Sequence, residues 1–179
     1  MDGPGGSPVP QYHLPHMATP TVYLETSFIG YLTARLSGDL VTAAHQKLTR
    51  VWWDEKRHKF ALHVSGFVVA EIGAGDPVAI EERMAVLADI SQLDIPPDAE
   101  RVGRALIEKR AIPANAAVDA LHVAVAAVCG MDYLLTWNCK HIANAATRDD
   151  IATVIRSLGY KPAVLCTPEE LMGEDRDNE

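Results

Sequence analysis

The chain has 179 residues, the usual length of a single globular domain. Hydrophobic residues make up 48 % and charged residues 22 %, a balance that excludes wholesale disorder and a collagen-like fibre. The net charge of −8 argues against non-specific binding to duplex nucleic acid, although bound metal ions would supply positive charge for another mode of binding. The longest apolar or Gly run covers only positions 123–131, so we expect no membrane span.

The two ends of the chain differ in composition from the part between them. Residues 1–16 are rich in Gly and Pro and lack an apolar period, which predicts a disordered leader or sequence that precedes the natural start at Met17. Residues 173–179 predict an acidic, flexible tail, which leaves residues 17–172 as one domain. The three cysteines are widely spaced and no secretory signal is evident, so we expect a cytoplasmic protein.

Strand and helix patterns alternate along this domain. In the first half they predict a strand at 21–24, helices at 27–34 and 40–59, a strand at 60–64, a helix at 65–71 capped by Ser65, and a helix from 76 onward. In the second half they predict a weak strand at 92–95, helices at 98–110 and 113–129, a strand at 132–136, a helix at 149–158 and a strand at 163–166. A capping box from Thr167 to Glu170 predicts a last short helix. The alternation predicts an α/β fold, a mostly parallel central sheet with helices on both faces.

Polar residues follow the strands where a ligand crevice is expected, because such sheets bind ligands beyond the carboxyl ends of their strands. Glu25, Thr26 and Ser27 follow the first strand, and Glu71 lies at the end of the helix after the second. Thr136 is the last residue of the predicted strand at 132–136, and Asn138 comes two residues later. Alone, Glu25, Thr26 and Ser27 are also typical helix caps, and Glu71 is typical of an exposed helix end.

One helix carries an unusual pair of ionisable residues. Between 114 and 128 the sequence is Ala-rich and apolar except for Asp119 and His122, so we expect this helix to be buried. A carboxylate on a buried helix is costly unless it is hydrogen-bonded, paired or bound to a metal. His122 is more typical of a hydrogen-bonded core histidine than of a ligand.

Three carboxylates and an amide therefore point to one crevice. Glu25, Glu71 and Asp119 would repel one another when close together unless a cation were present. Hard oxygen ligands suit Mg²⁺ or Mn²⁺, and such ions bind phosphodiesters and activate water. The residues themselves predict a site for metal-dependent phosphoester hydrolysis.

The same segments resemble a known family. The order YLETS at 23–27, VSGFVVAEI at 64–72, VDALHVAVA at 118–126 and DYLLTWNCKHI at 132–142 resembles the PIN-domain family, and within it the VapC-type toxins of prokaryotic type II toxin–antitoxin pairs. The resemblance covers about residues 21–171. It implies a PIN-like three-layer sandwich, an Mg²⁺- or Mn²⁺-dependent ribonuclease acting on RNA, a cognate antitoxin and a homodimer.

The resemblance also implies roles for individual residues. Catalytic and metal-binding positions fall at Glu25, Glu71, Asp119 and Asn138, with Asp119 and Glu25 as primary ligands and Glu71 holding a water or acting as base. Thr26, Ser27, Thr136 and Lys140 would bind or orient the substrate, and His141 follows Lys140 where it could contact the RNA backbone.

Two positions depart from the family pattern. Glu25 stands where the family usually has Asp, and Asn138 stands where it has a fourth acid. Fewer charges weaken the binding of a second ion most, so one well-held ion is expected. The alternative function is a degenerate, non-catalytic PIN module that binds RNA or protein. A phosphatase on a similar sheet is disfavoured, because neither a D-x-D-x-T motif nor a P-loop is present.

Overall fold

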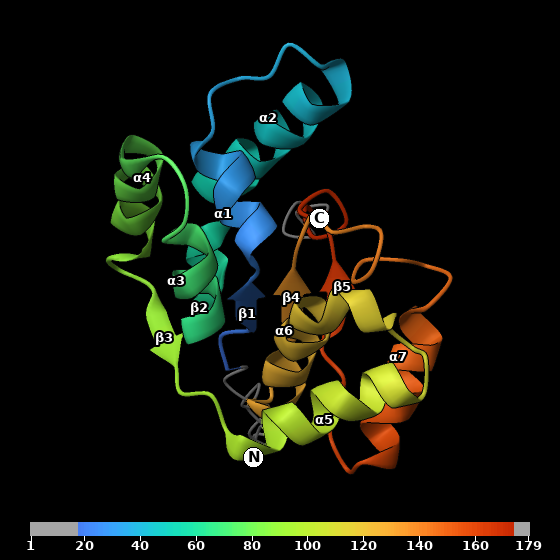
Figure 1. The fold of residues 1–179 in the computed structure, drawn as a ribbon. Coiled ribbons are helices and arrows are strands. Elements are labelled where there is room, and N and C mark those ends of the chain that lie inside the picture. The colour runs from blue at the N-terminus through green and yellow to red at the C-terminus, as the bar shows by residue number, and fades with distance from the viewer. Residues whose placement is uncertain (1–17, 174–179) are drawn as a thin grey trace, which may run out of the picture.

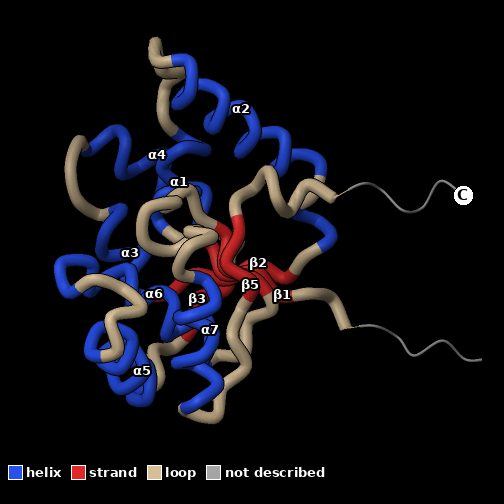
Figure 2. Tube along the Cα trace, turned by 90° about the vertical axis from the view of Figure 1, so that its right-hand side faces the viewer, coloured by secondary structure: helices blue, strands red, loops and turns tan. Residues whose placement is uncertain are grey.

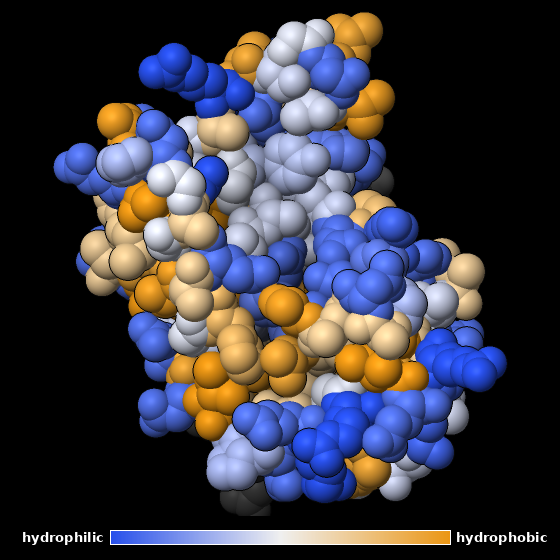
Figure 3. All heavy atoms as spheres, viewed as in Figure 1, coloured by the Kyte–Doolittle hydropathy of each residue, from blue (hydrophilic) through white to orange (hydrophobic). Residues whose placement is uncertain are grey.

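The computed structural model describes residues 18–173. The predicted leader at 1–16 lies outside the described residues, as does the predicted tail apart from Gly173. No helix within 18–173 is long and apolar enough to span a bilayer. The face seen in Figure 3 is largely hydrophilic, with a band of hydrophobic residues between α3 (Gly66–Ile72) and α5 (Pro97–Glu108).

The core of the fold is a five-stranded sheet in the order β3-β2-β1-β4-β5 (Figure 1). All four strand pairings are parallel, which confirms the predicted sheet class. The strands are β1 (Thr21–Leu24), β2 (Ala61–Ser65), β3 (Ser91–Leu93), β4 (Tyr133–Leu135) and β5 (Val164–Cys166). The central strand β1 is buried over Val22, Tyr23 and Leu24, as expected of a strand covered on both faces.

Helices connect the strands and cover both faces of the sheet. Besides α3 and α5 they are α1 (Thr26–Thr33), α2 (Leu40–Glu55), α4 (Pro77–Leu87), α6 (Ala117–Val128) and α7 (Arg148–Ser157), with short 3₁₀ helices at Arg57–Lys59 and Ala114–Ala116. Figure 2 shows α2 on one side of the sheet and α3, α5, α6 and α7 on the other. In Figure 1, α1 continues beyond the carboxyl end of β1. The predicted α/β sandwich is thus confirmed.

Close packing fixes the position of α6. Gly103 of α5 faces this helix, and a Cβ at that position would lie 3.1 Å from Cδ2 of Leu121 and 3.6 Å from the carbonyl oxygen of Ala120. The absence of a side chain at Gly103 therefore lets the two helices approach closely. From residue 120 to residue 127 only Leu121 of α6 is not fully buried, and this packing determines where the polar residues of the helix lie.

Three local predictions differ from the structure. The helix predicted at 40–59 ends at Glu55 and continues as a 3₁₀ turn, because residues 56–59 are polar and carry no apolar face that would hold a further helical turn. Ser65 stands before α3 but makes no capping hydrogen bond, since its hydroxyl bonds to Tyr23 instead. The capping box of Thr167 and Glu170 forms, with N–H to side-chain bonds of 2.9 and 3.2 Å, but it closes a turn rather than a helix.

The Glu170 carboxylate gives the fold a pH-dependent contact. Both of its oxygens accept hydrogen bonds of 2.8 Å from Arg148, and this guanidinium, with the Thr167 N–H, holds the pKa of Glu170 below its ordinary value of 4.5. A carboxyl whose pKa is lowered by folding stabilises the folded state above its unfolded pKa, and that contribution disappears as pH falls through the folded pKa.

We therefore expect Glu170→Gln to lower the free energy of unfolding at neutral pH and to have less effect in acid. Urea unfolding of both proteins at about pH 7 and about pH 3 measures the difference. A gap between the two proteins that is equally large at both pH values would contradict this assignment.

Candidate metal centre

The candidate site lies where the carboxyl ends of three neighbouring strands meet. Glu25 directly follows β1, Thr136 directly follows β4, and Ser65 is the last residue of β2. The Glu25 N–H donates to the carbonyl of Leu135 at 3.1 Å, so the ends of β1 and β4 are held together. The chain leaves β1 toward β2 on one side and returns to β4 on the other, which makes this edge the switch point where such sheets bind ligands.

Glu25 is a buried carboxylate that is bonded through only one of its oxygens. Its side chain is 5 % exposed, and it caps the N-terminus of α1. Oε2 accepts hydrogen bonds from the Ser27 N–H at 3.0 Å, from the Ser27 hydroxyl, and from the Thr136 hydroxyl at 2.7 Å. No hydrogen bond to Oε1 occurs within residues 18–173, so this oxygen retains its lone pairs for a ligand.

Glu71 repeats this arrangement from the last turn of α3. Its Oε2 accepts hydrogen bonds from the Thr26 hydroxyl and from Nε2 of His122 at 2.9 Å. The His122 bond is the main reason that the pKa of Glu71 lies below its ordinary value, and the Thr26 bond lowers it further against the opposing effect of burial. Glu71 is therefore ionised at neutral pH, and over the described part of the chain its Oε1 accepts no hydrogen bond.

His122 reaches the carboxylates from inside the core. The imidazole is 1 % exposed, and its Nδ1 lies 2.7 Å from the Tyr23 hydroxyl, which in turn lies 2.7 Å from the Ser65 hydroxyl. Burial raises the pKa of Tyr23 far above its ordinary value, so the phenol stays protonated. One potential ligand atom from each of Glu25, Glu71 and His122 lies within 4.8 Å of the others.

The residues after β4 form the rim of the site. The Trp137 N–H donates to the Ser27 hydroxyl at 2.8 Å, and the Asn138 N–H donates to the Thr136 hydroxyl at 2.8 Å. The side-chain oxygen of Asn138 accepts the His141 N–H at 3.1 Å, so this amide already closes its own loop. Lys140 is exposed on the same loop.

Asp119 lies apart from the close group. It occupies the first turn of α6, one turn before His122, and it is half-buried rather than buried. The expectation of full burial is wrong for this first turn, since Val118 is 44 % exposed and continuous burial begins at Ala120. Its carboxylate makes no hydrogen bond within residues 18–173. A negative charge in the first turn of a helix is also favourable by itself, because the N-terminus carries the positive end of the helix dipole.

The structure thus brings together most, but not all, of the residues singled out from the sequence. Glu25, Ser27 and Thr136 form one hydrogen-bonded group, with Asn138 attached through its backbone N–H. Thr26, Glu71 and His122 form a second group, and potential ligand atoms of Glu25, Glu71 and His122 lie within 4.8 Å of one another. Within residues 18–173, the side chains of Lys140 and Asp119 make no hydrogen bond to either group.

The sequence assigns no functional role to His122, which contacts Glu71, or to Tyr23, which contacts His122. His122 was visible as one of two ionisable residues in an apolar helix. Tyr23 gave no signal beyond its place in a buried strand.

Comparison with known proteins places the fold. No protein-family model matches the sequence, and no curated protein matches it. Among solved structures, the chain is similar to Mycobacterium tuberculosis VapC20, a sarcin–ricin loop cleaving toxin, with 16 % identity, a TM-score of 0.52, and coverage of 79 % of this chain and 100 % of that one.

A second similar structure is VapBC2 from Rickettsia felis, bound to a DNA fragment from its promoter. The identity is 15 %, the TM-score is 0.51, and the match covers 67 % of this chain and 89 % of that one. The chain therefore shares the fold of VapC-type PIN-domain toxins over most of its length. At these identities the likeness concerns the fold alone.

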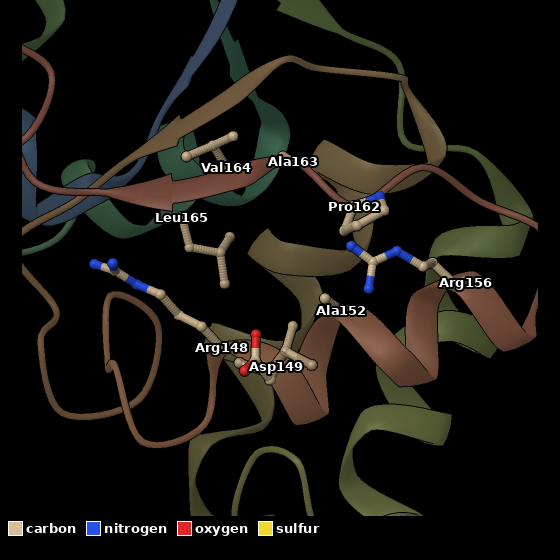
Figure 4. Close-up of a pocket in the computed structure, with 9 residues that line it drawn as sticks. Arg148, Asp149, Ala152, Arg156, Pro162, Ala163, Val164 and Leu165 are labelled. Carbon is tan, nitrogen blue, oxygen red and sulfur yellow. The ribbon is translucent and has the colours of Figure 1, made fainter.

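A separate pocket lies between α7 and β5 (Figure 4). It is lined by side chains that include Arg148, Asp149, Arg156 and Leu165. None of its lining residues belongs to the group around Glu25 and Glu71, and Arg148 is already paired with Glu170. The pocket is therefore distinct from the candidate metal centre.

The Thr136 hydroxyl supports the site structurally. We expect Thr136→Val to lower the free energy of unfolding by about 1–3 kcal/mol, because Glu25 and the Asn138 N–H each lose a buried hydrogen-bond partner. Chemical denaturation without added metal measures this loss. Thr33→Val is the matched control, since that hydroxyl only bonds back to the Ile29 carbonyl within α1, and an equal loss in both variants would contradict the assignment.

Proposed function

We propose that this protein is a metal-dependent endoribonuclease and the toxin of a type II toxin–antitoxin pair. The observation that carries the proposal is the pair of carboxylates at the switch point of a VapC-like sheet. Glu25 and Glu71 each accept hydrogen bonds through Oε2, and no donor among residues 18–173 bonds to Oε1 of either. Two anionic groups this close together fit a hard divalent cation, which would neutralise their repulsion.

In this proposal Mg²⁺ or Mn²⁺ is held by Glu25 and Glu71, and Asp119 and Asn138 complete the ligand set. When bound, such an ion would polarise the scissile phosphate and lower the pKa of an attacking water. The protein's hydroxyl groups do the positioning. Ser27 and Thr136 hold the Glu25 carboxylate, and Thr26 holds that of Glu71.

Substrate binding is assigned to the rim of the site. Lys140 is exposed on the loop that follows Asn138, and His141 comes next. In this proposal both contact the RNA phosphate backbone, whose negative charge an acidic protein would otherwise repel. We extend the proposal to a cognate antitoxin, a homodimer and a cytoplasmic location, in keeping with the VapC-like fold.

The mechanism predicts which substitutions abolish cleavage. We expect Glu25→Gln and Asp119→Asn each to slow Mn²⁺-dependent RNA cleavage at least about 100-fold, because groups that merely support metal ligands already contribute about 10- to 100-fold. An RNA stem-loop of the sarcin–ricin type is the first substrate to test, since VapC20 is described as cleaving that loop. Glu81→Gln on the exposed face of α4 is the control.

Each outcome bears on a different residue. Unchanged cleavage in Glu25→Gln would remove the mechanism as a whole. Unchanged cleavage in Asp119→Asn alone would remove Asp119 from the ligand set and leave its charge as a stabiliser of the α6 N-terminus.

The second candidate is a PIN module that binds RNA or protein without cleaving it. One specific observation favours it, since Asn138 replaces an acid of the family pattern and its side-chain oxygen is occupied by the His141 N–H. Calorimetric titration with Mn²⁺ separates the two functions. A nuclease is expected to bind the ion in a manner that Glu25→Gln weakens, whereas titration without any binding heat would favour the non-catalytic module.

A further inference from the structure

A chain of hydrogen bonds runs from the core to the candidate metal centre. It begins at the Ser65 hydroxyl, passes through the Tyr23 hydroxyl at 2.7 Å and Nδ1 of His122 at 2.7 Å, and ends with Nε2 of His122 at 2.9 Å from Oε2 of Glu71. Its members come from four elements: β2, β1, α6 and α3. Ser65, Tyr23 and His122 are each at most 1 % exposed, so water does not compete for the two bonds that join these three residues.

The chemistry of the last link decides what His122 can do. An ionised carboxylate only accepts hydrogen bonds, so Nε2 of His122 must carry the proton that it donates to Glu71. A ring nitrogen that carries a proton has no lone pair for a metal ion. The other nitrogen, Nδ1, is occupied by the Tyr23 hydroxyl. The imidazole is therefore close to the carboxylates without a nitrogen free to bind a cation.

We propose that His122 is a positioning residue rather than a metal ligand, and that Tyr23 and Ser65 hold its ring so that Glu71 presents Oε1 beside Glu25. The proposal deepens the proposed function and rests on it for the metal-binding measurements. Glu71 needs such support because it lies at the end of a short helix with its side chain 38 % exposed. Glu25, by contrast, is buried, directly follows β1 and accepts a hydrogen bond from Thr136. The Thr26 hydroxyl supplies the second hold on the same Glu71 oxygen.

The first experiment measures Mn²⁺ affinity by calorimetry in four variants. His122→Leu removes the donor, and we expect about a 10- to 100-fold loss of affinity. His122→Gln places an amide N–H near the position of Nε2, and we expect it to recover most of that loss. Tyr23→Phe keeps the ring that packs in the core and removes only the hydroxyl, so we expect an intermediate loss. His63→Gln is the matched control, because Nδ1 of that β2 histidine is buried and has no hydrogen-bond partner among the described residues.

The Mn²⁺ affinities of these variants distinguish a positioning role of His122 from a role in folding stability alone. Thermal unfolding is measured alongside, since both His122 variants alter a buried site. Recovery in His122→Gln relative to His122→Leu supports positioning, whereas equal affinities in these two folded variants would overturn it. Wild-type affinity in His122→Leu would overturn it as well.

The second experiment asks directly whether nitrogen binds the ion. Electron spin-echo measurements on Mn²⁺-loaded protein detect the coupling of a ligated ¹⁴N nucleus. We expect no such coupling in the wild-type protein. A ¹⁴N coupling that disappears in His122→Gln would show the imidazole to be a ligand and would overturn the proposal.

The third experiment needs no metal, so it distinguishes failure of this inference from failure of the proposed nuclease. Nitrogen-15 spectra of the metal-free protein, assigned with His122→Gln, report which ring nitrogen carries the proton. We expect a protonated Nε2 in the wild-type protein and a shifted Nδ1 resonance in Tyr23→Phe. A wild-type ring with an unprotonated Nε2 would overturn the inference, whereas absence of Mn²⁺ binding with the expected spectra would overturn only the proposed function.

Discussion

The structure depends on keeping two carboxylates close together beside a hydrophobic core. Glu25 and Glu71 would repel each other there, and each is stabilised through a single oxygen by donors that the fold supplies. The donors are a helix N-terminus and hydroxyls for Glu25, and a hydroxyl and an imidazole for Glu71. Each carboxylate is thus bonded through Oε2, and within residues 18–173 its Oε1 accepts no hydrogen bond.

The parallel sheet makes this arrangement possible. Its strand order places β1 between β2 and β4, so residues that follow all three strands meet at one edge. The close approach of α5 to α6 at Gly103 then fixes the helix that carries His122. The helix contact at Ala120 and Leu121 therefore helps to fix the neighbouring His122, whose imidazole reaches Glu71.

The chain shares the fold of the two similar VapC structures although the sequence identity is only 15 % and 16 %. The site of this chain has its own features on that scaffold. A glutamate stands at the end of β1, an amide bonded to its own loop follows β4, and a buried histidine holds the second carboxylate. These features are local to the chain's own residues, and the shared fold does not determine them.

The sequence by itself determined the alternation of strands and helices, because apolar period and capping residues are local properties. It also placed Glu25, Glu71 and Thr136 near one another, since parallel strands end at one edge. Only the tertiary structure decided that His122 contacts Glu71, 51 residues away, and Tyr23, 99 residues away. It also decided that the Ser65 hydroxyl bonds to Tyr23 instead of capping α3, and that Asp119 lies at the partly exposed start of α6. These outcomes depend on how helices pack across the sheet, and no local pattern records that packing.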